Sequence, residues 1–117
     1  MRQPRIFTAS FFAPDDHKPG TVFSIANRQP RGFGLPKVDV FRPRTALRNF
    51  RIHQDWARYR REYIGLLSNR DWEIYRWLEA QEGDVTFCCW EADPGECHRK
   101  WAAEYLRSAL GCEVMVR

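Results

Sequence analysis

Short apolar runs along the chain have the composition and spacing of β-strands. Runs rich in β-branched and aromatic residues predict strands at residues 5–10, 21–25, 84–90 and 112–116. The segment APDDHKPG (residues 13–20) separates the first two runs with residues that favour turns. The pattern therefore predicts two strands in the first quarter of the chain and two in its last third.

Apolar residues at three- and four-residue steps predict three helices. The first is expected at about 54–67, with an aromatic face opposite an arginine-rich face. The second begins at Asn69 or Asp71 and ends at Gly83, and the third covers about 97–110. The first two of these helices precede the strand at 84–90, and the third lies between the last two strands.

Residues 27–44 interrupt this regular pattern. Three prolines and two glycines lie among the arginines of this segment. We expect a long irregular loop with one short strand at 38–41. Loops of this length are uncommon in small domains and are often functional.

The order helix, helix, strand, helix, strand in the second half predicts an α/β fold. We expect a mainly parallel sheet flanked by helices, in a Rossmann-like two-layer or three-layer sandwich, and a single domain over residues 1–117. A right-handed crossover through the last helix would join the last two strands. Ligands of such sheets collect at the carboxyl ends of the strands, which is where the turn after strand 84–90 is expected.

Positive charge is concentrated in the middle of the chain. The net charge is +4, but residues 28–61 contain ten Arg or Lys and only two acidic residues, Asp39 and Asp55. This concentration favours a polyanionic partner such as a nucleotide or nucleic acid. The alternative is a solvated surface that binds nothing specific.

The sequence shows no sign of membrane insertion or secretion. No apolar run approaches the roughly 20 residues that span a bilayer, and the N-terminal segment lacks the pattern of a signal peptide. We therefore expect a cytoplasmic protein without a membrane partner. Its four cysteines are then expected to be reduced thiols.

Residues 88–99, CCWEADPGECHR, contain the densest group of reactive side chains. Zinc sites usually draw on spaced pairs such as Cys-x-x-Cys. Cys88 and Cys89 are adjacent and would point to opposite faces of a strand. Cys97 and His98, placed together on a helix, would diverge by about 100°. The spacing argues against a closed site, so we expect no metal and no cofactor.

Cys97 and its neighbours allow three interpretations. At the first turn of a helix, the helix dipole and Arg99 would favour a Cys97 thiolate. Phosphatase and sulfur-transfer loops, however, place the arginine several residues after the cysteine, and Cys97 can instead be a small buried residue. The third interpretation is an anion site at the helix N-terminus. Asp93 could cap the same helix, and Glu91 could pair with Arg99 or His98.

The arrangement of these residues resembles the DUF488 family. The resemblance rests on Cys-x-Glu after a buried strand, a proline-containing loop, and Cys-His-Arg opening an amphipathic helix, here CCWEADPGECHRKWAAEYL. The segments IFTASFFAP, FSIANRQPRGF and DWARYRREYIGLL also resemble parts of the family, so nearly the whole chain is covered. Trp90 between Cys89 and Glu91, and the tandem cysteines 88 and 89, are departures from the pattern.

The resemblance implies a compact α/β domain of the prokaryotic cytoplasm with unknown function, and some members are labelled DNA-repair-like. The motif residues that it carries over by position are Cys89, Glu91, Cys97, His98 and Arg99. Looser matches are Thr8, Ser24 and Arg28.

Three functional hypotheses follow. The first is a pocket for a nucleotide or a nucleic-acid phosphate, extended by basic residues and by aromatic side chains that stack on bases. Its phosphate-binding residues would be Thr8, Ser10, Ser24, Arg28 and Arg99, with Phe33, Phe41 or Trp90 for stacking.

The second hypothesis is an enzyme that acts on nucleotides or nucleic acid. Its catalytic residues would be Glu91, Cys97, His98 and Arg99. Glu91 and His98 would serve as acid and base, and Arg99 would stabilise developing negative charge. The third is an interaction module, in which the aromatic helices form a homodimer face and the motif only holds the turn together.

Overall fold

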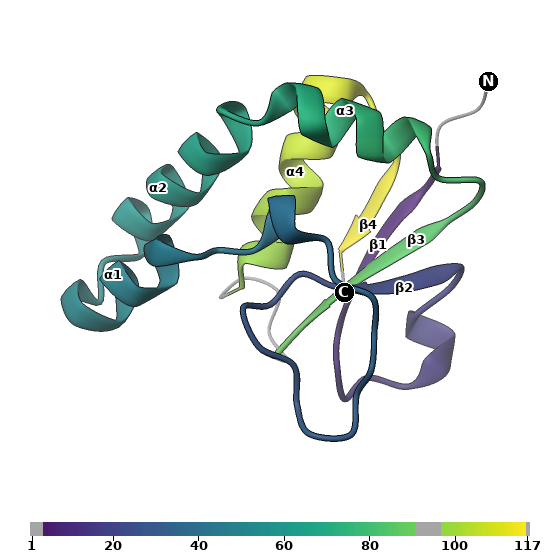
Figure 1. Ribbon diagram of the computed structural model, residues 1–117, viewed down its shortest axis with the longest axis horizontal. Helices are drawn as coiled ribbons and strands as arrows, with labels where there is room; N and C mark the ends of the chain where they lie inside the picture. Colours follow the sequence, from purple (N-terminus) through teal and green to yellow (C-terminus); the bar gives the residue numbers. More distant parts are fainter. Residues whose placement is uncertain (1–3, 91–96, 117) are drawn as a thin grey trace.

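A parallel four-stranded sheet forms the centre of the molecule (Figure 1). The computed structural model describes residues 4–90 and 97–116. The strands, in chain order, are β1 (Ile6–Ser10), β2 (Thr21–Ser24), β3 (Val85–Cys89) and β4 (Val114–Val116). They lie in the order β2-β3-β1-β4, and each neighbouring pair is parallel. The predicted α/β fold with a parallel sheet is confirmed.

Within the described residues, four α-helices and two short 3-10 helices accompany the sheet. The α-helices are α1 (Thr45–His53), α2 (Trp56–Ser68), α3 (Asp71–Glu79) and α4 (His98–Leu110). The 3-10 helices are η1 (Asp15–His17) and η2 (Asp39–Phe41). The α-helices lie to one side of the strands in Figure 1, and η1 lies beyond β2 on the other side.

The two central strands are buried along their whole length. All five residues of β1 and of β3 are buried, which is typical of parallel strands covered on both faces. The main core joins the sheet to α2, α3 and α4, and its aromatic centre includes Phe41 and Phe87 with ring centroids 4.8 Å apart. A smaller core at the carboxyl ends of the strands contains Phe11, Cys88 and Cys97.

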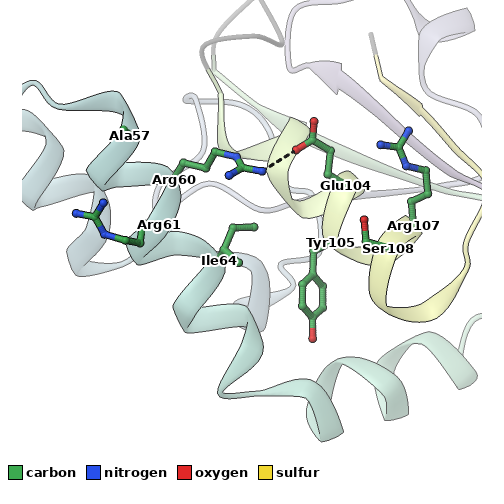
Figure 2. A pocket seen from close by; sticks show the side chains of 8 residues that line it. All are labelled: Ala57, Arg60, Arg61, Ile64, Glu104, Tyr105, Arg107 and Ser108. Atoms are coloured by element: carbon green, nitrogen blue, oxygen red, sulfur yellow. Dashed lines mark ion pairs between the residues drawn. The ribbon is translucent and has the colours of Figure 1, made fainter.

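Side chains of helices α2 and α4 also line an open surface hollow of about 740 Å³ (Figure 2). Three arginines contribute to its lining, namely Arg60, Arg61 and Arg107. Arg60 is paired across the hollow with Glu104, at 3.7 Å between nitrogen and oxygen. The hollow is therefore lined by side chains of both charges. The described residues that line it include none of the Cys-His-Arg motif.

Most predicted elements are present, and one is wrong. The four strands and the three helices occur where they were expected, with ends shifted by a few residues. The expected strand at 38–41 is instead the 3-10 helix η2, because the Arg42 N–H donates to the Asp39 carbonyl, three residues back, instead of to a neighbouring strand. Helix α1 was not predicted.

Candidate functional site

The carboxyl ends of β1, β2 and β3 meet the start of α4 at one edge of the sheet. Because the strands are parallel, Ser10, Ser24 and Cys89 end their strands at this edge. Cys97 is the N-cap residue of α4, and His98 and Arg99 follow in its first turn. The fold therefore brings the predicted motif to the edge where ligands of parallel sheets collect.

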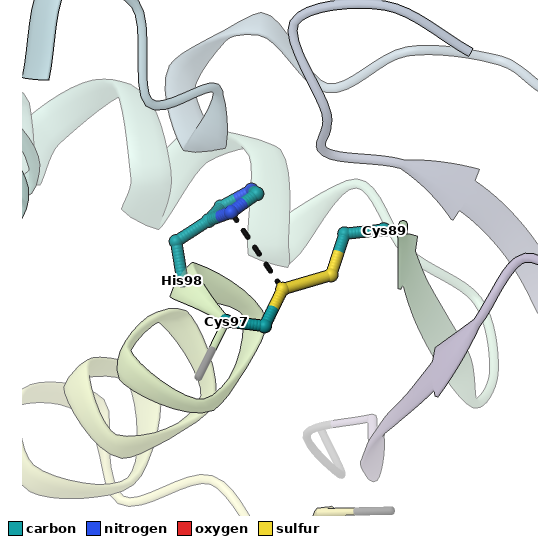
Figure 3. Close-up of side chains that lie close together, drawn as sticks. All are labelled: Cys89, Cys97 and His98. Carbon is teal, nitrogen blue, oxygen red and sulfur yellow. Dashed lines mark hydrogen bonds between the residues drawn. A yellow bond between two sulfur atoms is a disulfide. The ribbon is translucent and has the colours of Figure 1, made fainter. Parts of the chain in front are cut away.

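Cys89 and Cys97 are joined by a disulfide, with His98 beside it (Figure 3). This corrects the expectation that all four cysteines are reduced; Cys88 and Cys112 are free thiols. That expectation considered only the cellular compartment, whereas the fold places the end of β3 directly against the start of α4. All four cysteines are buried.

The imidazole of His98 is held in one tautomer. Its Nε2–H donates a hydrogen bond to the Ile25 carbonyl at 2.7 Å, so Nδ1 carries the lone pair. Nδ1 faces Cys97 Sγ at 3.8 Å (Figure 3). The pKa of His98 is lowered to about 4, mainly by burial; the hydrogen bond to Ile25 opposes this shift, and the positive charge of Arg99 adds to it. His98 is therefore neutral at neutral pH.

Arg99 is completely buried, which is unusual for a guanidinium group. Its Nη1 donates to Cys89 Sγ at 3.0 Å. The guanidinium group of Arg99 therefore contacts the disulfide from the interior of the protein.

The hydroxyl groups of Ser10 and Ser24 form hydrogen bonds with the backbone near the strand ends. Thr8, Ser10 and Ser24 are all buried. Ser10 Oγ donates to the Trp90 carbonyl at 3.4 Å and accepts from the Phe12 N–H at 3.2 Å. Ser24 Oγ accepts from the N–H of Ala26, the residue two positions on, at 3.4 Å. Glu91 lies outside the described residues.

A pocket of about 540 Å³ lies beside this edge and shares His98 with the motif. Its lining combines two arginines with aromatic rings: Arg28, Arg51, Phe50, Tyr59 and Trp90. Trp90 is 44% exposed, and its Nε1–H donates to the Arg28 carbonyl at 2.6 Å. This bond fixes the position of the Arg28 backbone relative to the end of β3.

Sequence reasoning found only part of this pocket. Arg28 and Trp90 were expected near a ligand, and both line it. Arg51 and Phe50 were missed because they lie on α1, and Tyr59 was assigned only to an apolar helix face. The expected stacking residue Phe41 is fully buried, so its ring cannot meet a base. The concentration of arginine after residue 28 was the available signal for Arg51.

Comparison with known proteins identifies a family. A family model described as "Domain of unknown function DUF488" matches residues 38–106, which is more than half of the chain. No curated protein and no solved structure matches the chain. Across residues 4–90 and 97–116, every helix is too short or too polar to cross a membrane.

Proposed function

The chain belongs to the DUF488 family, whose function is unknown, and from the pocket beside its Cys-His-Arg motif we propose that it binds a nucleotide or the phosphates of a nucleic acid. The observation that carries the proposal is the composition of that pocket, in which Arg28 and Arg51 share the lining with three aromatic rings. Guanidinium groups form forked, charge-assisted hydrogen bonds to phosphate. Aromatic rings stack on bases without regard to sequence.

The two arginines and Trp90 have the exposure that binding requires, whereas Tyr59 is buried. Arg28 and Arg51 are exposed, and Trp90 is partly so. Phe50 packs against Tyr59 with ring centroids 5.0 Å apart, which gives the pocket an aromatic wall. The size of the pocket, about 540 Å³, is within the range of sites for small ligands.

Charge around the pocket supports the same partner. Residues 28–61, which supply most of the lining, carry ten basic and two acidic side chains. Arg31, Arg44 and Arg48 are exposed in this stretch and are proposed to extend the contact to neighbouring phosphates of a strand. A single nucleotide would need only the pocket itself.

Among the residues predicted to contact phosphate, Arg28 keeps that role in the proposal and Arg51 joins it. Arg99 is assigned an indirect role because its guanidinium is fully buried beside Cys89. The hydroxyls of Ser10 and Ser24 support the backbone that shapes the edge of the sheet. The catalytic hypothesis depends on Glu91, outside the described residues, so the proposal is limited to binding.

Fluorescence anisotropy with a labelled single-stranded oligonucleotide tests the proposal, with unlabelled mononucleotides as competitors. We expect binding at low salt that weakens as salt rises, because phosphate contacts release counterions. Arg28→Ala and Arg51→Ala should each weaken binding about tenfold to a hundredfold, since a hydrogen bond to a charged group contributes about 1.5–3 kcal/mol. Each should also reduce the salt dependence.

Arg76→Ala is the matched control. Arg76 is an exposed arginine on α3, away from α1 in Figure 1, and its loss changes the net charge by the same amount. It should leave binding nearly unchanged. The proposal fails if Arg76→Ala weakens binding as much as Arg28→Ala does. It also fails if the wild-type protein binds neither oligonucleotide nor mononucleotide at low salt.

A further inference from the structure

We propose that Cys89, Cys97 and His98 form a Zn²⁺ site once the disulfide between the two cysteines is reduced. The two Sγ atoms and one imidazole nitrogen all lie within 4.8 Å of one another. The three residues come from the end of β3 and the start of α4, so the contact between these two elements brings the ligands together. The proposal does not depend on what the neighbouring pocket binds.

The spacing of the ligand atoms suits a tetrahedral zinc ion. With zinc–sulfur and zinc–nitrogen distances of about 2.3 and 2.0 Å, neighbouring ligand atoms of a tetrahedral ion lie roughly 3.5–3.8 Å apart. The distance from His98 Nδ1 to Cys97 Sγ is 3.8 Å. The two sulfur atoms have to separate, which reduction of their bond allows, and the three ligand atoms already lie within 4.8 Å of one another.

The backbone at Cys97 explains why two adjacent residues can share one ion. The sequence argument against a metal placed Cys97 and His98 together on a helix, where their side chains would diverge. Cys97 is instead the N-cap residue, with extended backbone angles of φ −138° and ψ 143°. From this position its side chain converges with that of His98.

Groups around the three ligands prepare them for a metal. The hydrogen bond from His98 Nε2–H to the Ile25 carbonyl fixes the ring orientation and leaves Nδ1 as the coordinating atom, as outer partners of zinc ligands usually do. The Arg99 guanidinium donates a hydrogen bond to Cys89 Sγ at 3.0 Å, so this sulfur atom also has an outer partner that fixes its position. His98 also lines the pocket, which gives an ion a route to the site.

The described residues supply three ligands, so a tetrahedral ion takes its fourth from water or another group. Site formation is coupled to redox state. A dithiol reductant transfers two electrons and two protons to the Cys89–Cys97 disulfide and becomes a disulfide itself. Zn²⁺ then displaces the two thiol protons, which pass to solvent.

Cobalt titration of the intact protein tests the site, since Co²⁺ in a tetrahedral site with thiolate ligands has visible and near-ultraviolet absorption. The protein is reduced with dithiothreitol, desalted under nitrogen, assayed for four free thiols and titrated with Co²⁺. We expect absorption that saturates at one ion per chain and disappears when Zn²⁺ is added. The oxidised protein should not develop it.

Variants locate the ligands and provide matched controls. Cys89→Ser, Cys97→Ser and His98→Asn should each weaken Co²⁺ binding at least about tenfold, the effect reported even for outer-shell partners of zinc ligands. Cys88→Ser and Cys112→Ser remove the other two buried thiols and should leave the absorption unchanged. Circular dichroism identifies any variant that fails to fold.

Two results would overturn the proposal, and the first needs no variant. Reduced wild-type protein with four free thiols and no saturable cobalt absorption would contradict it. Equal loss of absorption in Cys112→Ser and Cys97→Ser would show that the cobalt binds thiols without regard to position.

Discussion

Individual residues determine how closely the ends of neighbouring strands approach each other, and Gly20 is the clearest case. It lies directly before β2 with φ +74°, in the left-handed region that favours glycine. A Cβ atom added there would lie 2.0 Å from the Asp84 carbonyl oxygen. That same oxygen accepts a hydrogen bond from the Thr21 N–H at 2.9 Å. Gly20 therefore permits the close approach that aligns the start of β2 with the start of β3.

Replacing Gly20 should destabilise the protein strongly. Gly20→Ala combines an unfavourable backbone conformation with a clash against backbone atoms that cannot move aside. We expect a loss of about 2–4 kcal/mol in the free energy of unfolding. Urea denaturation followed by circular dichroism measures it.

Gly65→Ala is the control for this substitution. Gly65 is exposed in α2, and nothing lies within 4 Å of an added Cβ. Alanine should therefore stabilise the protein by about 0.5–1 kcal/mol, because it is the better helix former. Equal effects of the two substitutions would contradict the role assigned to Gly20.

At the scale of elements, α2 depends on a side chain at its N-terminus. Asp55 is the N-cap residue, and its Oδ1 accepts a hydrogen bond from the Arg58 N–H at 3.0 Å. Asp55→Ala should cost about 1 kcal/mol of unfolding free energy, whereas Asp55→Asn keeps an acceptor and should cost less. Thermal unfolding of the two variants tests this. Equal losses would mean that the carboxylate charge, not the cap, stabilises the helix.

Sequence periodicity predicted the elements whose apolar faces are well marked. The buried runs of β1 and β3 and the apolar stripe of α4 carry strong patterns, and these elements lie where they were expected. Helix α1 gave a weak signal because Ala46 is its one fully buried residue. Its N-cap position, Arg44, has φ +49° and forms no side-chain cap, so the usual start signal is missing.

The position of the motif could be predicted from chain order, but its contacts could not. The sequence placed Cys97, His98 and Arg99 at the start of the last helix, beside the end of a buried strand. The disulfide between Cys89 and Cys97 forms because β3 ends beside the start of α4 and because the backbone of Cys97 is extended. The pocket likewise needs α1 and α2 to pack beside Trp90, which no local pattern specifies.

For the whole molecule, the strand order joins distant parts of the chain. β3, from the second half, lies between β1 and β2 from the first half, and β1 lies between β3 and β4. The main core also combines distant parts of the chain, since Ile6 and Ile25 pack in one cluster with Phe87 and Leu106. Neither half of the chain can complete the sheet or the core alone.

The segment that matches the family model tests this dependence. Residues 38–106 contain β3 and the helices α1 to α3, but β1, β2 and β4 fall outside this range. In such a fragment β3 would lose its hydrogen-bonded partner on both edges, and the core would lose Ile6 and Ile25. Unpaired backbone groups and missing apolar contacts both oppose folding.

We expect the fragment 38–106 to show no cooperative unfolding in urea, although residual helical signal can remain. The full chain should unfold in one transition that coincides when followed by circular dichroism and by tryptophan fluorescence, as expected for a single domain. A sharp, cooperative transition in the fragment would show that the matched region folds by itself and that the outer strands are additions to it.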